Sequence, residues 1–246
     1  MRLDRQRQNA EPEDLLELID SLLAKQTTLA GKKILVTAGP TREALDPVRY
    51  FSNYSSGKMG YAIAKEARKR GAYVTLVSGP TALDAPAGVE VVEIQSAEEM
   101  YHAVTNRFSD VDIVVKSAAV ADYQPEEVLS QKRKKQGNEW SVPLVKTKDT
   151  LLEIGKRKDK QILVGFAAES EQLDMYAKEK LKRKNLDLIV ANNITEKGAG
   201  FDVDTNVVSV FTKDNHAIDY PEQSKAEVAS VILDELEAYM KRRELL

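Results

Sequence analysis

The sequence predicts an α/β fold with three layers, in which helices cover both faces of a mostly parallel sheet. From residue 32 onward, short apolar runs alternate with amphipathic stretches of helical period. Most runs are apolar at nearly every position, as is typical of strands that are buried on both faces. Strands that alternate with helices in this way form parallel sheets, because each connection must cross over the sheet.

The first half of the chain supplies helices and strands of this pattern. The predicted helices cover residues 12–25, 58–70 and 96–108. The predicted strands cover 32–40, 72–80 and 89–94, and a further strand begins at residue 112. Gly71 is placed to end the second helix, and Ser96 with Glu99 three residues later predicts a capping box.

The second half continues the alternation and ends in a long helix. The predicted helices cover residues 149–158, 171–185 and about 223–243. The predicted strands cover 161–169, 186–193, 206–212 and 217–220. Asn185 is placed to close the second of these helices. A turn over residues 213–216 predicts that the last two strands form a hairpin.

The composition is that of an ordinary globular chain and excludes several kinds of chemistry. Of 246 residues, 42% are apolar and 30% are charged, and the net charge of -3 does not attract nucleic acid or membranes. The absence of cysteine excludes disulfides, thiol nucleophiles and cysteine-bound metals, and only His102 and His216 are present. No apolar run is long enough to span a membrane, and the basic N-terminus is not followed by a signal-peptide core. We therefore expect a cytoplasmic protein with neither nucleic acid nor a membrane as partner.

The loops at the carboxyl ends of the predicted strands are short, small and polar. They follow Thr37, Val77, Val115, Val164 and Val190 and read AGPTRE, SGPT, KSAAVAD, GFAAES and ANN. In open parallel sheets, ligands bind beyond these strand ends, where the strand order reverses. Small residues let a ligand approach the backbone, so we expect a binding site at this edge.

The loop before the helix at 58–70 is long and rich in polar groups. Directly before and at the helix start stand Asn53, Ser55, Ser56, Gly57 and Lys58. The N–H groups and dipole of a helix start suit an anion, whereas the simpler interpretation is that a serine caps the helix and the glycine shapes the turn. Long loops in compact domains are usually functional or disordered, and the polar groups favour function. The dinucleotide fingerprint and the Walker spacing are both missing.

Basic residues gather in two further places. Residues 132–135 read Lys-Arg-Lys-Lys. Such a run is commonly a solvated face, but a mobile basic loop beside a parallel-sheet edge suits the neutralisation of a triphosphate. Lys180 and Lys184 lie on one face near a helix end, where stabilisation of the helix dipole is the simpler explanation. Among the carboxylates, Asp46, Asp122 and Asp149 can each hold Mg²⁺, although their spacing demands no metal site.

Five stretches taken together resemble one protein family. They are VTAGPTREALDPVRYFSNYSSGKMG, SAAVADYQP, the basic run, VGFAAES and RKNLDLIVANN. The family is phosphopantothenate–cysteine ligase of coenzyme A biosynthesis, also called phosphopantothenoylcysteine synthetase. The resemblance implies a Rossmann-like ligase domain over residues 31–246. Residues 1–30 resemble the tail of the flavin-dependent decarboxylase that bacteria usually fuse to this ligase, together with the connector, so we expect neither flavin nor decarboxylation in this chain.

The resemblance implies a reaction in two steps. The carboxylate of 4′-phosphopantothenate attacks the α-phosphate of CTP, which binds with Mg²⁺, and pyrophosphate leaves. The amine of L-cysteine then displaces CMP from the acyl-cytidylate to form the amide. Such work needs lysines, amides, backbone N–H groups and Mg²⁺, and these are the groups that the sequence offers. The family also implies a homodimer with sites near the subunit interface.

The resemblance further assigns residues to this site. Asn53 matches an asparagine expected to hydrogen-bond the acyl group, and Lys132 matches a lysine expected to close over the phosphates. With the helix-start residues above, the nucleotide-binding set is Gly39, Ser55, Ser56, Gly57, Lys58, Ser117, Ala118, Asp122, Lys132, Lys148, Asp149, Thr150, Leu151, Phe166, Lys180 and Lys184. The substrate-binding set is Asn53, Ala118, Ala119 and Asp122. The metal ligands stay unassigned.

Two positions depart from the family pattern, and two other functions remain open. Arg133 stands where relatives often have an apolar residue, and Lys148 stands where others have proline, so any contact there is expected through the backbone. The lysines at 132, 180 and 184 favour CTP over ATP, although the sequence does not tell how strictly. A nucleotide-binding regulatory or NAD(P)-dependent protein would bind dinucleotide without turnover, and a nucleic-acid-binding module would show strongly salt-dependent binding.

Overall fold

The computed structural model describes residues 27–134, 137–169, 173–193, 200 and 203–245. The helix predicted over residues 12–25 and the last lysine of the basic run lie outside these ranges. None of the described helices is long and apolar enough to cross a membrane.

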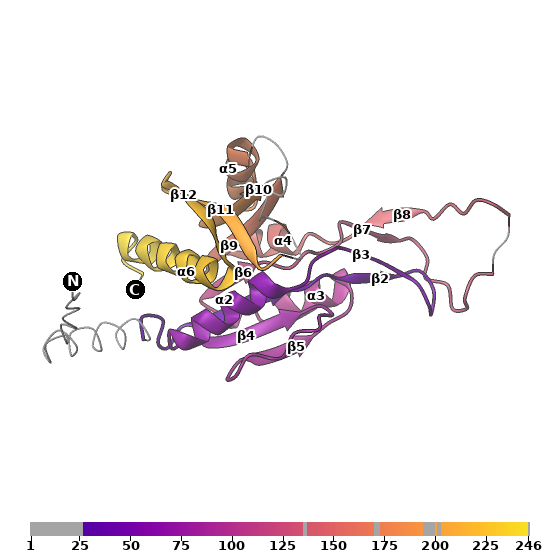
Figure 1. The fold of residues 1–246 in the computed structure, drawn as a ribbon, viewed down its shortest axis with the longest axis horizontal. Coiled ribbons are helices and arrows are strands. Elements are labelled where there is room, and N and C mark those ends of the chain that lie inside the picture. The colour runs from indigo at the N-terminus through magenta and orange to yellow at the C-terminus, as the bar shows by residue number, and fades with distance from the viewer. Residues whose placement is uncertain (1–26, 135–136, 170–172, 194–199, 201–202, 246) are drawn as a thin grey trace, which may run out of the picture.

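An eight-stranded sheet forms the centre of the molecule (Figure 1). Its strands, in sheet order, are β12 (Ala217–Ser224), β11 (Thr205–Thr212), β10 (Leu188–Asn193), β9 (Ile162–Glu169), β6 (Ile113–Lys116), β1 (Lys33–Ala38), β4 (Tyr73–Ser78) and β5 (Glu90–Glu93). The strands from β10 to β5 all pair in parallel, and only β11 and β12 are antiparallel. The predicted mostly parallel sheet is therefore confirmed.

Helices cover both faces of this sheet. On one face, α2 (Lys58–Lys69) packs beside α6 (Lys225–Arg242), and on the other lie α3 (Ala97–Thr105), α4 (Thr150–Arg157) and α5 (Leu173–Arg183). A short 3₁₀ turn, η1, covers Phe108–Asp110. Alternate residues of each strand enter the two cores: Ile34 and Val36 face α2 and α6, whereas Leu35 faces the other layer. The predicted three layers are confirmed.

The strand order reverses between β1 and β6. After β1 the chain adds β4 and β5 on one side, and it then crosses back to add β6, β9 and β10 on the other. Chain segments that leave the carboxyl ends of β1 and β6 therefore diverge, and a crevice opens between them. The register pairs Thr37 with Lys116, so the two strands end side by side.

Four short strands were not expected from the sequence. β2 (Arg42–Ala44) pairs with β3 (Tyr50–Ser52), and β7 (Tyr123–Pro125) pairs with β8 (Leu144–Lys146), each as an antiparallel hairpin. The two hairpins contact each other and extend away from the sheet (Figure 1). Each strand has three residues, which is too short for a period to show in the sequence.

Other local predictions were wrong in detail. Neither Ser55 nor Ser56 caps α2: the N-cap residue is Gly57, in the left-handed region with φ of 80°, and no side-chain hydrogen bond caps the helix. Ser96 does accept from the Glu99 N–H, but the Glu99 carboxylate accepts from the N–H of Gln95. The segments GFAAES and ANN are not loops after strand ends, because β9 continues to Glu169 and β10 to Asn193.

The start of α2 lies against the ends of β1 and β4, and glycines make this possible. A Cβ on Gly60 would lie 2.6 Å from the Ala38 Cβ and 2.9 Å from the Thr37 carbonyl oxygen. A Cβ on Gly79 would lie 1.8 Å from the Pro40 carbonyl oxygen. Neither position leaves room for a side chain, so glycine is required at Gly60 where α2 meets β1, and at Gly79 where the segments after β4 and β1 meet.

We expect Gly60→Ala to destabilise the protein although alanine favours helix. Alanine gains up to ~1 kcal/mol in helix propensity, but overpacking against β1 costs roughly 1–3 kcal/mol. Denaturant unfolding should show a net loss of stability, whereas Lys65→Ala on the exposed face of the same helix should stay within about 0.5 kcal/mol of the parent. A Gly60→Ala protein as stable as the parent would show that α2 can move away from β1 freely.

Candidate functional site

Two adjoining cavities lie at the carboxyl ends of the central strands. The larger has a volume of about 700 Å³ and the smaller about 340 Å³. The residues that line both are Ala118, Val120, Asp122, Phe166 and Lys180. Successive residues of a strand point to opposite faces, and accordingly Lys116 lines only the larger cavity while Ser117 lines only the smaller. The end of β6 thus forms part of the wall between them.

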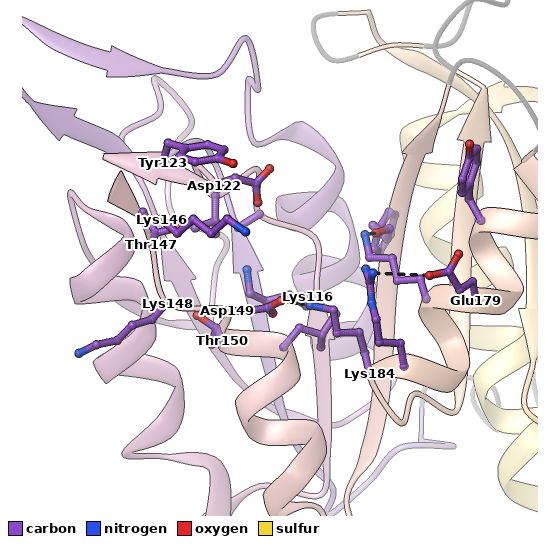
Figure 2. A pocket seen from close by; sticks show the side chains of 17 residues that line it. Lys116, Asp122, Tyr123, Lys146, Thr147, Lys148, Asp149, Thr150, Glu179 and Lys184 are labelled. Atoms are coloured by element: carbon purple, nitrogen blue, oxygen red, sulfur yellow. Dashed lines mark hydrogen bonds and ion pairs between the residues drawn. The ribbon is translucent and has the colours of Figure 1, made fainter. Parts of the chain in front are cut away.

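The larger cavity is rich in positive charge (Figure 2). Its basic lining residues are Lys116, Lys146, Lys148, Lys180, Arg183 and Lys184. Its acidic lining residues are Asp122, Asp149 and Glu179. These side chains come from β6, β8, α5 and the start of α4, so segments far apart in sequence build one basic wall. An excess of cations in a concave site attracts a ligand with several negative charges.

Lys180 and Lys184, whose spacing predicted a shared helix face, both line this cavity. The Lys180 ammonium donates to the Phe166 carbonyl oxygen at 2.6 Å, and Lys184 forms an ion pair with Asp149. Burial lowers the pKa of Lys184, and the nearby charge of Asp122 opposes that shift. Their direction places them in the cavity, which stabilisation of the helix dipole alone does not require.

Lys116 was missed by the sequence analysis. It ends the buried strand β6, is only 8% exposed, and lies beside Asp149 and Lys184 in Figure 2. Burial lowers the pKa of Lys116 to about 7, and the positive charges of Lys180 and Lys184 act in the same direction while Asp122 opposes them. The available signal was a lysine directly after the apolar residues IVV of a predicted buried strand.

The N-terminus of α4 forms another part of the larger cavity. Asp149 caps this helix by accepting from the Leu152 N–H at 2.9 Å, and Thr150 and Leu151 line the cavity beside it. The Thr150 hydroxyl is buried without a hydrogen-bond partner among the described residues. Lys148, in contrast, turns away to pair with Glu98 and to lie over the Tyr101 ring. Any contact of residue 148 with a ligand is therefore left to its backbone.

The smaller cavity lies at the start of α2. Ser55, Gly57, Lys58 and Gly60 of the α2 start line it. Its further lining residues include Ser117, Ala119, Asn192, Asn206 and Lys225. Lys225 is itself the first residue of α6, so two helix starts and two lysines converge here. Helix starts present N–H groups and positive dipole ends, and this cavity therefore suits a small anion such as a phosphate.

The remaining predicted residues, Asn53, Gly39, Ser56 and Lys132, do not line either cavity. Asn53 lies beside the cavities, because its side-chain amide donates to the Ala119 carbonyl oxygen at 2.8 Å. Gly39 and Ser56 line neither cavity, although Gly39 lies against Gly57. Lys132 is exposed on the long connection between β7 and β8 and lines neither cavity.

A cluster of four side chains lies beside Lys132. The Asp46 carboxylate pairs with Arg49 and accepts from the N–H of Arg133 at 3.3 Å. The Arg49 and Arg133 guanidinium groups lie 4.5 and 5.0 Å from the centre of the Trp140 ring. The hydrogen bond from Arg49 holds the pKa of Asp46 well below its usual range. This cluster joins the two hairpins.

Asp46, Asp122 and Asp149, the carboxylates considered for Mg²⁺, do not form a cluster that could hold the ion. Asp46 belongs to the cluster with Arg49, and Asp149 is occupied by a helix cap and Lys184. Within the described ranges, no three histidine or acidic residues gather in a way that could hold a metal ion. A divalent ion at this site would need the oxygens of a bound ligand.

Comparisons with known proteins agree on one relationship. The bifunctional coenzyme A biosynthesis protein CoaBC of Bacillus subtilis is 49% identical over 235 residues, which are 94% of this chain and 58% of that protein. The corresponding protein of Haemophilus influenzae is 44% identical over 234 residues, again 94% and 58%. The chain thus spans less than two thirds of the length of these curated relatives.

Solved structures and a family model show the same likeness. The crystal structure of the C-terminal domain of a CoaBC protein is 45% identical, has a TM-score of 0.76, and is matched over 88% of this chain and 99% of that one. The family model described as the C-terminal domain of DNA/pantothenate metabolism flavoprotein matches residues 29–240. From its sequence and its fold, the chain belongs to this family of DNA/pantothenate metabolism flavoprotein C-terminal domains.

Proposed function

We propose that this chain is a phosphopantothenate–cysteine ligase that joins 4′-phosphopantothenate and L-cysteine with CTP. One observation carries the proposal: a strongly basic cavity and a small anion-binding cavity share a wall at the strand reversal. A polyphosphate in one and a phosphate-bearing acid in the other would bring their reacting groups together at that wall. The coenzyme A biosynthesis proteins among the relatives support this choice of substrates.

The larger cavity takes the nucleotide in this proposal. Lys180 on α5, Lys184 directly after it and Lys146 on β8 face the phosphates, and the N–H groups at the start of α4 bind polar atoms of the nucleotide. A Mg²⁺ ion held largely by oxygens of the nucleotide would neutralise part of the phosphate charge. Because the described residues offer no cluster of acidic ligands, the ion depends on the nucleotide for most of its coordination.

The smaller cavity takes 4′-phosphopantothenate. Its phosphate binds at the start of α2 beside Lys58, and Lys225 lies on the opposite side. In this proposal Ser55, Gly57 and Lys58 contact phosphopantothenate, whereas the sequence led us to expect them as nucleotide contacts. The carboxylate then points toward Ala118, Asp122 and Lys180 at the shared wall.

Chemistry follows from this placement. A carboxylate oxygen attacks the α-phosphorus of CTP, the bond to pyrophosphate breaks, and an acyl-cytidylate forms. The amine of L-cysteine attacks the acyl carbon, and CMP leaves with the electron pair of the acyl–oxygen bond. The protein contributes position and charge stabilisation, with Lys180 beside the phosphate and the Asn53 amide beside the acyl group.

Two further parts of the proposal concern segments beyond the cavities. The hairpin connection carrying Lys132 closes over the phosphates during activation, although Lys132 lines neither cavity in this structure. The chain acts as a homodimer, for which Val48, Phe51 and Tyr54 on the first hairpin supply exposed apolar surface. It works in the cytoplasm beside a phosphopantothenoylcysteine decarboxylase, with residues 1–30 as the tail of that domain and residues 31–246 as the ligase domain.

The overall proposal is tested by pyrophosphate release with phosphopantothenate and each nucleoside triphosphate in turn. We expect release to require Mg²⁺ and to be faster with CTP than with ATP, because the phosphates need a counter-ion. Addition of cysteine should then yield CMP and the amide. Equal rates with ATP would contradict the CTP preference, and binding of NAD(P) or of oligonucleotides without pyrophosphate release would favour another function.

Lys132→Gln tests the closing of the basic segment. We expect the variant to bind phosphopantothenate normally but to form little acyl-cytidylate in a rapid-quench measurement, because the charge is needed only during activation. Lys134→Gln, an exposed lysine of the same segment, is the matched control and should keep most of the rate. Normal acyl-cytidylate formation in Lys132→Gln would show that the basic run is a solvated surface without a role in activation.

Asn53→Asp tests the second step. A negative charge beside the acyl group opposes the developing oxyanion, and loss of one such donor costs ~2.7–4 kcal/mol, a hundredfold or more in rate. We expect acyl-cytidylate to accumulate and to be detected by mass after rapid quenching. Asn215→Asp makes the same chemical change in an exposed turn and should have no effect on the rate. A folded Asn53→Asp protein with normal turnover would leave Asn53 as a loop-shaping residue.

A further inference from the structure

Lys116 stands apart from the other lysines of the larger cavity. It is fixed on a strand in the centre of the sheet, between Thr37 of β1 and Gly165 of β9. Because Val114 belongs to the core under α3, α4 and α5, the side chain of Lys116, two residues later, points to the same face and into the larger cavity. Its position therefore does not depend on a flexible loop.

The groups that face Lys116 are mostly positive. Lys180 and Arg183 lie on α5 and Lys184 directly follows it, Lys146 lies on β8, and Asp149, the N-cap residue of α4, is paired with Lys184. Asp122, in the loop after β6, is the acidic group that attracts the Lys116 charge. Glu179 completes the set, at 3.6 Å from Arg183. The Lys116 ammonium forms no hydrogen bond or ion pair with any described residue.

A buried ammonium without a hydrogen-bonded partner is costly, and a neutral amine is less so. The fold nevertheless keeps a lysine at this position and directs it into a cavity that suits a polyanion. We propose that Lys116 contacts the phosphates of the bound nucleotide and takes up a proton from solution as they enter. This inference rests on the proposed function for the identity of the nucleotide, but not for the contact with phosphate.

The expected pH dependence follows from the direction of the shift. In the empty cavity the pKa of Lys116 is about 7, so at pH 6 the amine already carries its proton and at pH 8 only about a tenth does. Bound phosphates favour the charged form and raise this pKa. Binding should thus take up almost no proton at pH 6 and close to one at pH 8, and affinity should fall as the pH rises above 7.

Calorimetric titrations in buffers of different ionisation enthalpy measure this proton uptake directly. The probes are CTP, ATP and inorganic tripolyphosphate, without phosphopantothenate, so that no reaction occurs. Phosphate monoesters lose their second proton near ~pH 6, so titrations of CTP and ATP at pH 8 report protons taken up by the protein. Wild-type protein should take up close to one proton with CTP. With tripolyphosphate, whose last proton dissociates at a higher pH, the uptake is taken as the difference between the wild type and Lys116→Met, and this difference should be close to one proton.

Three variants identify the group that takes up the proton. Lys116→Met should abolish the uptake and weaken binding at pH 7 by roughly 10- to 100-fold, as expected for a lost hydrogen bond to a charged group. Lys116→Arg keeps a permanent charge and should bind without uptake. Lys184→Met removes a second lysine of this cavity whose pKa burial lowers, and it should retain most of the uptake.

The outcomes separate this inference from the proposed function. Thermal unfolding checks that the methionine variant folds, and an apolar side chain should be tolerated at this buried position. Uptake that persists in Lys116→Met, or that is absent from the wild type at pH 8, would overturn the inference. If neither CTP nor ATP binds, but tripolyphosphate shows uptake that depends on Lys116, the contact stands and the proposed nucleotide reaction fails.

Discussion

The close approach of α2 to the ends of β1 and β4 is the constraint on which the site depends. It places a helix start directly at the strand reversal, and backbone atoms pack where Gly60 and Gly79 have no side chains. In dinucleotide-binding folds, glycines in one short run allow the same close approach of helix and strand. Here the hairpin of β2 and β3 separates strand from helix, so the glycines are dispersed along the chain. The helix start and the strand end therefore pack closely although the dinucleotide fingerprint is missing.

Charge is used in two different ways in this fold. Arg70, buried between α2 and α6, pairs with Glu66, Asp234 and Glu237 and donates to Ser230, so its burial is compensated within the protein. Lys116 is buried to a similar degree but has no such partner among the described residues. A charge that is satisfied internally contributes to the core, whereas one that lacks a partner inside a cavity is available to a ligand.

The two hairpins connect these elements to the proposed chemistry. Asn53 follows β3 and donates to the carbonyl oxygen of Ala119 in the loop after β6. Lys132 lies on the connection between β7 and β8. The cluster of Asp46, Arg49, Arg133 and Trp140 ties both hairpins together at the base of the basic segment. Asn53 and Lys132, which we propose for the two reaction steps, therefore both lie on the pair of joined hairpins outside the sheet.

The sequence by itself determined the layers and most helices and strands, because long apolar runs and helical periods are local properties of the chain. It also singled out Lys180, Lys184 and the polar loop before α2, which line the two cavities in part. It missed the three-residue strands, the true cap of α2 and the burial of Lys116 in a cavity. These depend on contacts between segments far apart in the chain: hairpin strands form only when paired, and the pKa of Lys116 falls only when folding buries it and brings Lys180 and Lys184 close to it. Tertiary structure decided them because burial and neighbouring charge exist only after folding.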